Sequence, residues 1–78
     1  MEFGQLVRII CRLMLRRAGA ADYEPAGYLN TMRVPERHEP FDVRTEGGET
    51  VHARVVHVAA PPPGQVGEFT IRLEETER

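Results

Sequence analysis

QLVRIICRLMLRR, residues 5–17, carries the strongest pattern in this sequence. Arginine recurs at every fourth position, at Arg8, Arg12 and Arg16, and nearly every residue between these positions is apolar. An α-helix turns by about 100° per residue, so the three arginines would lie along one narrow polar stripe of a helix. The sequence therefore predicts an amphipathic α-helix over residues 2–18.

The apolar arc of this predicted helix covers about two-thirds of its circumference, which is nearly twice what a surface helix needs. One sheet can cover only one side of such a helix. Each large apolar side chain left in water forfeits about 1.5–3 kcal/mol, so we expect the rest of the arc to contact a second copy of the chain or a partner subunit. The residues predicted to bind this partner are Phe3, Val7, Ile9, Cys11 and Leu15.

Residues 19–40 are expected to be irregular, because prolines interrupt every longer pattern in this segment. Two local structures remain open. One is a short helical turn over residues 26–32, with Pro25 at its first position, and the other is a brief extended piece over residues 32–34. About twenty residues without clear structure is long for a compact domain. We therefore expect this segment to wrap the core or to contact another chain.

The sequence predicts a β-hairpin over residues 41–59, because apolar and polar residues alternate on both sides of the sequence EGG at 46–48. A three-residue loop that ends in a left-handed Gly48 keeps both apolar sets on one face of the hairpin. The rival two-residue turn, Gly47-Gly48, would place Val43 opposite His52 and put the two apolar sets out of phase. The favoured register pairs Phe41 with Ala53, Asp42 with His52 and Val43 with Val51.

The alternation slips after Val55, because Val56 and Val58 would point to the other face of the strand. Either a β-bulge lies near Val55 and Val56, or this strand is covered on both faces. Alternation returns in a last strand over residues 68–74. The predicted inner face of the sheet consists of Phe41, Val43, Val51, Ala53, Val55, Phe69, Ile71 and Leu73, and it would cover Leu6, Ile10, Leu13 and Met14 of the helix.

These elements predict one small α+β domain over residues 1–78, in which the N-terminal amphipathic helix packs on a three- to four-stranded antiparallel sheet. A chain of this size is only marginally stabilised by a single core. Cys11 is the single cysteine, so no intramolecular disulfide can form, and no cysteine–histidine set has zinc spacing. Oligomerisation is the remaining remedy, and we expect no cofactor and no metal.

The charge balance argues against a domain that coats nucleic acid, because the net charge is −2. All ten basic residues are arginine, which fits either GC-rich codon usage or selection for bidentate anion contacts. Arg8 and Arg12 interrupt the apolar N-terminal stretch, so we expect no transmembrane span and no secretory signal. We expect a cytoplasmic location, with which one reduced cysteine is compatible.

Catalytic chemistry finds little support in the sequence. Serine is absent, which removes the Ser–His–Asp class. We expect Cys11 to be a buried, inert thiol. His52 and His57 would lie on opposite faces of an unbulged strand, so they could not share a metal ion. Asp42 is a ready partner for His52, and we expect His57 and His38 to lie in solvent. No catalytic residue is predicted.

The leading hypothesis is a non-catalytic assembly or binding module that self-associates, or docks on a partner protein, through its N-terminal helix. The alternative is an anion-binding module that uses Arg8, Arg12 and Arg16 to contact RNA or an acidic membrane surface. Against RNA, no aromatic residues are interleaved with these arginines in the sequence. A small enzyme with an active site between two protomers comes third.

Overall fold

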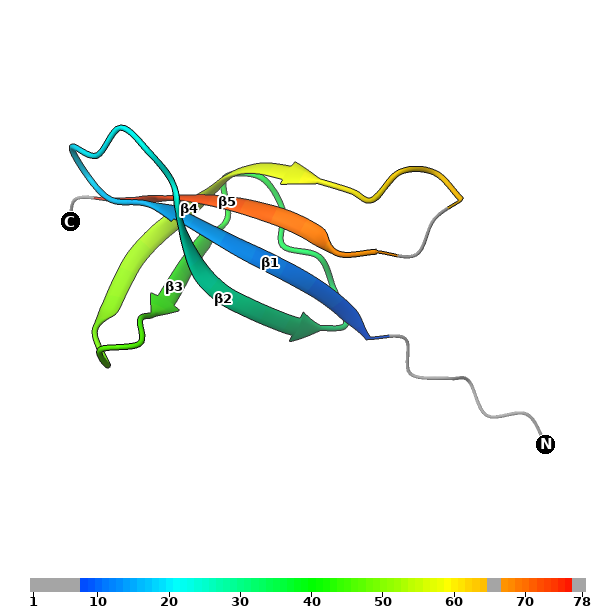
Figure 1. The fold of residues 1–78 in the computed structure, drawn as a ribbon, viewed down its shortest axis with the longest axis horizontal. Coiled ribbons are helices and arrows are strands. Elements are labelled where there is room, and N and C mark those ends of the chain that lie inside the picture. The colour runs from blue at the N-terminus through cyan, green and yellow to red at the C-terminus, as the bar shows by residue number, and fades with distance from the viewer. Residues whose placement is uncertain (1–7, 65–66, 77–78) are drawn as a thin grey trace.

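The protein is built entirely from strands over the residues that the computed structural model describes, which are 8–64 and 67–76. No helix occurs in these ranges, so the predicted α+β fold is wrong: an all-β domain takes its place, and residues 9–16 of the predicted helix form a strand. Figure 1 shows the arrangement. The strands are β1 (Ile9–Arg16), β2 (Glu24–Thr31), β3 (Pro40–Arg44), β4 (Thr50–Ala59) and β5 (Phe69–Glu75).

All five strands belong to one sheet with the order β2-β1-β5-β4-β3. β1 runs parallel to β5, whereas the other neighbouring pairs are antiparallel, so the sheet is mixed rather than the antiparallel sheet that the sequence predicts. The sheet curls into a half-barrel, with β2 and β3 as its two open edges (Figure 1). Curling lets the sheet cover its own apolar face without a helix.

β1 shows why the helix prediction fails. A spacing of four residues fits the period of a helix and is also a multiple of the two-residue period of a strand, so Arg8, Arg12 and Arg16 share a face in either structure. The two structures differ in which apolar residues lie opposite the arginines. In β1 the buried positions are Cys11, Leu13 and Leu15, which alternate strictly with exposed or half-buried ones. Hydrogen bonding to β2 on one side and β5 on the other selects the strand.

In the strand, the residues expected to face the sheet and those expected to face a partner change places. Ile10 and Met14 were expected under the sheet, but they point away from the core, and Ile10 is 40% exposed. Cys11 and Leu15 were expected to meet a partner, but they lie inside the core of the monomer. The apolar excess that suggested a partner on the helix is therefore a consequence of assuming helical geometry.

β2 occupies the middle of the segment that was expected to be irregular. It forms neither the helical turn over residues 26–32 nor an extended piece confined to 32–34. Its proline, Pro25, is tolerated because β2 is an edge strand that needs hydrogen bonds on one side only. Gly27 has a φ of +95°, and the pairing with β1 shifts register beside it. A bulged edge strand of this kind escapes sequence patterns that look for clean alternation.

The hairpin of β3 and β4 has the predicted register, in which Phe41 lies opposite Ala53 and Val43 opposite Val51. Gly48 is left-handed, with a φ of +86°, as the three-residue loop requires. The predicted bulge is also present, because the pairing of β4 with β5 skips Val56. The bulge turns Val58 back toward the core side, opposite Ile71.

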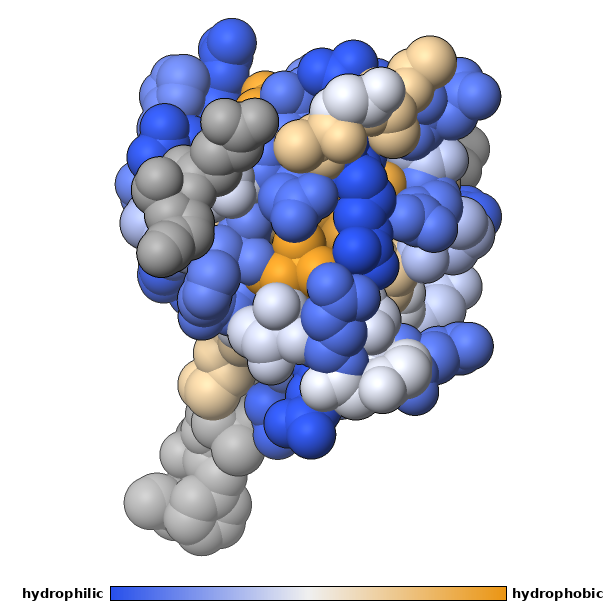
Figure 2. All heavy atoms as spheres, turned by 90° about the vertical axis from the view of Figure 1, so that its left-hand side faces the viewer, coloured by the Kyte–Doolittle hydropathy of each residue, from blue (hydrophilic) through white to orange (hydrophobic). Residues whose placement is uncertain are grey.

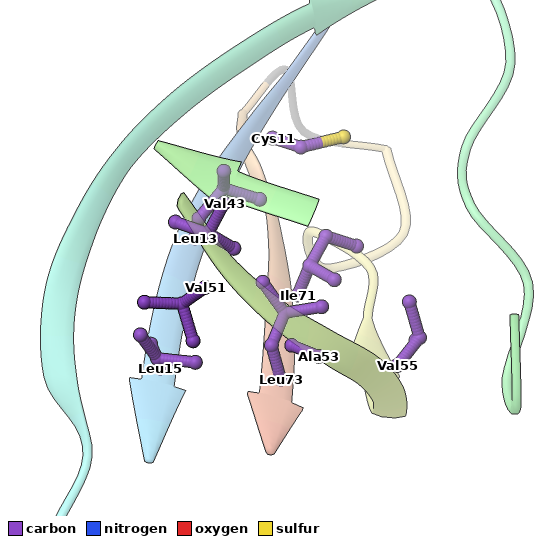
Figure 3. Close-up of a cluster of buried hydrophobic side chains, with 9 residues drawn as sticks. All are labelled: Cys11, Leu13, Leu15, Val43, Val51, Ala53, Val55, Ile71 and Leu73. Atoms are coloured by element: carbon purple, nitrogen blue, oxygen red, sulfur yellow. The ribbon is translucent and has the colours of Figure 1, made fainter. Parts of the chain in front are cut away.

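The core lies on the concave face of the sheet and draws on four of the five strands (Figure 3). Val34 of the segment between β2 and β3 packs against it, and the neighbouring Pro35 is buried. β2 and β3 are not paired with each other, and Val34 packs against the core from the segment that connects them. The buried apolar residues are Cys11, Leu13, Leu15, Val43, Val51, Ala53, Val55, Ile71 and Leu73.

Two adjacent residues of β1 test this strand. Leu15→Ala should lower the free energy of unfolding by about 2–5 kcal/mol, because Leu15 is buried in the core and the truncation leaves a cavity. Met14→Ala, on the half-buried outer face, should cost clearly less. Urea denaturation of both variants measures the two values. The opposite order would contradict the strand, because in the helix Met14 faces the sheet.

Candidate anion-binding face

The outer, convex face of the sheet gathers the arginines of three neighbouring strands. Residues paired across a ladder share a face, so the register defines this surface directly. The outer face is defined here as three cross-strand rows over β1, β5 and β4, with one residue from β2. The rows are Tyr28, Arg12, Thr70 and Ala59; Met14, Arg72 and His57; and Arg16, Glu74 and Arg54.

Charge on the outer face is strongly segregated from the rest of the molecule. The three rows hold four arginines and a single acid, Glu74, which gives a net charge of +3 on this face of a chain whose total is −2. Arg12, Arg54 and Arg72 are exposed, and none of them makes an ion pair with another described residue. Their guanidinium groups are therefore available to an anion from solution.

Tyr23, in the turn between β1 and β2, contacts three charged side chains at one end of this face. Its hydroxyl donates a hydrogen bond to Glu74 Oε2 at 3.1 Å, and Arg16 donates to the same oxygen. The Cζ atoms of Arg16 and Arg72 each lie 5.6 Å from the centre of the Tyr23 ring. Both guanidinium groups therefore lie within cation–π distance of the Tyr23 ring, which favours their positions beside it.

The pKa of Tyr23 is raised above its ordinary value. Burial is the largest cause, because it disfavours the phenolate, and the hydrogen bond and negative charge of Glu74 act in the same direction. The positive charges of Arg16 and Arg72 oppose this rise. Tyr23 therefore stays a neutral donor to Glu74 over the physiological range of pH.

The structure places the predicted anion-binding arginines as follows. Arg12 and Arg16 lie on the outer face, where Arg12 is exposed and Arg16 is half-buried beside Glu74. Arg8 is exposed just before β1 begins and is outside the three rows. Of the three arginines in the predicted stripe, only Arg12 and Arg16 therefore lie in the rows of the outer face, and a strand rather than a helix places them there.

The predicted partner-binding residues do not form one surface. Ile9 is half-buried against the core, and Cys11 and Leu15 are core residues. Phe3 and Val7 lie outside the described residues. Over the described part of the chain, these positions therefore offer little area to a partner protein.

Four residues of the site are missed by sequence reasoning. Arg54 and Arg72 were recognisable as outward residues of strands, but nothing in the sequence indicates that β5 pairs with β1 and brings them beside Arg12. Tyr23 and Tyr28 come from a segment interpreted as irregular, so their approach to the arginines is also unforeseen. The signal that the sequence offers is the presence of the β-favouring residues Tyr28 and Thr31 in YLNT, at 28–31.

The thiol and the imidazoles provide no catalytic arrangement within the described residues. Cys11 is fully buried, and burial raises the pKa of its thiol, which favours the unreactive protonated form. His52 Nδ1 lies 2.8 Å from Asp42 Oδ1 in an exposed cross-strand pair, as predicted. His57 is exposed on the outer face beside Arg72, and no group of three metal-binding side chains is found in residues 8–64 and 67–76.

A groove that shares Tyr28 with the outer face lies at one end of the half-barrel, between β2 and the turn that joins β3 to β4. It has a volume of about 680 Å³, and residues 24–28 and 44–47 line it together with Leu15 and Arg17. Figure 2 looks at this end of the molecule and shows apolar atoms at the bottom of a hollow bordered by hydrophilic residues. Arg17 is neutralised there by ion pairs with Glu24 and Glu49. The other charged residues that line the groove, Arg44 and Glu46, have opposite charges, so the groove lacks the net positive charge of the outer face.

Comparisons with protein families, with curated proteins and with solved structures find no match to this chain. Within the described residues there is also no helix with the length and apolar character required to cross a membrane. The candidate site therefore rests on the geometry of the outer face.

The environment of Tyr23 can be tested by alkaline titration. In a Tyr28→Phe variant, Tyr23 is the remaining tyrosine, and its ultraviolet titration should have a midpoint above the usual tyrosine pKa of about 10. Adding Glu74→Gln should lower this midpoint, because the negative charge is lost. Since the folded pKa is raised, the stability that Tyr23 contributes is complete below pH 10 and is lost as pH rises through the folded pKa. A midpoint at or below 10 in the folded protein would contradict the contact with Glu74.

Proposed function

We propose that this protein is a non-catalytic binding module that takes a phosphate-bearing polyanion on the outer face of β1, β5 and β4. The observation that supports the proposal is the convergence of Arg12, Arg54 and Arg72, exposed and without ion pairs to other described residues, on one face of a chain with net negative charge.

Arginine suits this role, because its planar guanidinium group donates two parallel hydrogen bonds to a phosphate. Diagonal neighbours on a sheet lie about 7–8 Å apart. Arg12 and Arg72 are diagonal neighbours across β1 and β5, and Arg72 and Arg54 are neighbours across β5 and β4. Several guanidinium groups can therefore bind one extended polyanion at the same time. Binding of this kind weakens steeply with salt.

The acidic residues outside this face help to confine a polyanion to it. Negative charge elsewhere on the molecule repels a polyanion and limits where it can bind. A cytoplasmic location, with which a single free cysteine is compatible, remains part of the proposal.

A second candidate function is self-association through β2. β2 pairs with β1 on one side, and its other edge carries no partner strand within the described residues. The large apolar side chains that are exposed gather around this edge: Ile10 is 40% exposed, Tyr28 is 63% exposed and Met32, just after β2, is 59% exposed. An open edge beside exposed apolar residues favours pairing with the same edge of a second copy.

The polyanion proposal is tested by replacing single arginines. Arg12→Gln and Arg72→Gln should each weaken binding to linear polyphosphate about tenfold, equivalent to about 1.4 kcal/mol for one charge-assisted contact. Each should also reduce the slope of log Kd against log salt by about 1. Arg44→Gln is the matched control, because it removes the same charge from an exposed residue at the rim of the groove.

Equal weakening by all three variants would contradict a localised site, because it would indicate a response to net charge alone. Binding to phosphatidylserine vesicles without binding to polyphosphate would favour a membrane surface as the ligand and would also contradict the proposal.

Self-association is tested by light scattering at micromolar concentration. Pairing through β2 predicts a mass near twice the 8.8 kDa of the monomer, and Met32→Glu should return the protein to the monomer. A monomeric wild-type protein would exclude this second candidate.

A further inference from the structure

We propose that the polyanion is a single-stranded nucleic acid, one base of which stacks on the ring of Tyr28 while Arg12 and Arg72 bind the neighbouring phosphates. This inference rests on the proposed function and specifies its ligand. The observation behind it is the position of Tyr28, which is 63% exposed and lies directly opposite Arg12 on the neighbouring strand. The structure thus supplies the aromatic neighbour that the order of residues in the sequence lacks.

Tyr28 differs from Tyr23 in how its ring is used. Tyr23 is held by Arg16, Arg72 and Glu74, so its face is already occupied. The side chain of Tyr28 makes no hydrogen bond and no cation–π contact with the described residues. An exposed ring of this size without a partner is the kind of surface on which a base can stack.

The neighbours of Tyr28 offer the other contacts that a nucleotide requires. Arg12 lies next to it across the ladder, and Thr70 follows on the far side of Arg12. Asn30 is two residues further along β2 and is also exposed. The amide of Asn30 and the hydroxyl of Thr70 can hydrogen-bond to the edges of an unpaired base. Aromatic, cationic and polar groups are therefore present within one small area of the sheet.

A single strand fits this arrangement better than a duplex or a membrane. The bases of a duplex are stacked on one another and present no free face to Tyr28. Lipid headgroups provide anionic charge for Arg12 and Arg72 but no aromatic face for stacking. Base–aromatic stacking accepts any base, so this geometry predicts little sequence preference.

The experiment measures the contribution of the bases separately from that of the phosphates. Fluorescence anisotropy compares three labelled probes of equal length: an oligouridylate, an abasic oligonucleotide with the same number of phosphates, and a duplex. The wild-type protein should bind the oligouridylate about 5- to 150-fold more tightly than the abasic probe, which is the range for one stacked base. It should bind the duplex more weakly than the oligouridylate.

Variants of Tyr28 assign this preference to the ring. Tyr28→Ala should bind the oligouridylate and the abasic probe equally, because the base loses its aromatic partner. Tyr28→Phe keeps the ring and should keep most of the preference. Met32→Ala is the matched control, since Met32 is similarly exposed but lies just beyond the end of β2. Circular dichroism of each variant verifies that the sheet is retained.

The outcomes separate this inference from the proposed function. If Arg12→Gln and Arg72→Gln weaken all probes but Tyr28→Ala leaves the preference for bases unchanged, the stacking inference is overturned and polyanion binding stands. Equal affinity of the wild-type protein for the oligouridylate and the abasic probe, or tighter binding of the duplex, also overturns stacking. If the arginine variants change nothing, both are overturned.

Discussion

The parallel pairing of β1 with β5 is the constraint on which the rest of this structure depends. It joins the first described strand of the chain to the last. Without it, β1 and β2 would form an isolated hairpin, and a two-stranded hairpin is marginally stable at best in water. With it, Leu13 and Leu15 lie beside Ile71 and Leu73, and all four side chains are buried in the core. A long-range pairing thus supplies the stability that local structure lacks.

The same pairing assembles the outer face. Arg12 and Arg16 belong to β1, whereas Arg72 and Glu74 belong to β5, so neither strand alone carries the arrangement. Tyr23 then contacts Glu74, which ties the turn between β1 and β2 to β5. Core and candidate site therefore depend on one set of hydrogen bonds, and the cohesion of the sheet keeps the guanidinium groups in place.

Division of charge explains how an acidic chain can carry a basic site. The ion pairs of Arg17 with Glu24 and Glu49 lie at the end of the half-barrel, and that of Arg33 with Glu39 lies in the segment before β3. In these places the acids neutralise arginines locally. On the outer face Glu74 is shared between Arg16 and Tyr23, which leaves the positive field of the neighbouring arginines largely uncompensated. Net charge is therefore a poor guide to the local potential of this protein.

Local pattern alone predicted the β3–β4 register and the alternation of β5, because turn chemistry and side-chain phase act over a few residues. It offered the bulge at Val56 as one of two alternatives, and the pairing of β4 with β5 decided between them. It also placed Arg12 and Arg16 on one face, since a spacing of four fits both a strand and a helix. It could not choose between these two structures for β1, nor recognise β2 as a bulged edge strand. Those choices, and the neighbourhood of Arg12, Arg72 and Tyr28, came from pairing between residues far apart in the chain, which short-range periodicity does not encode.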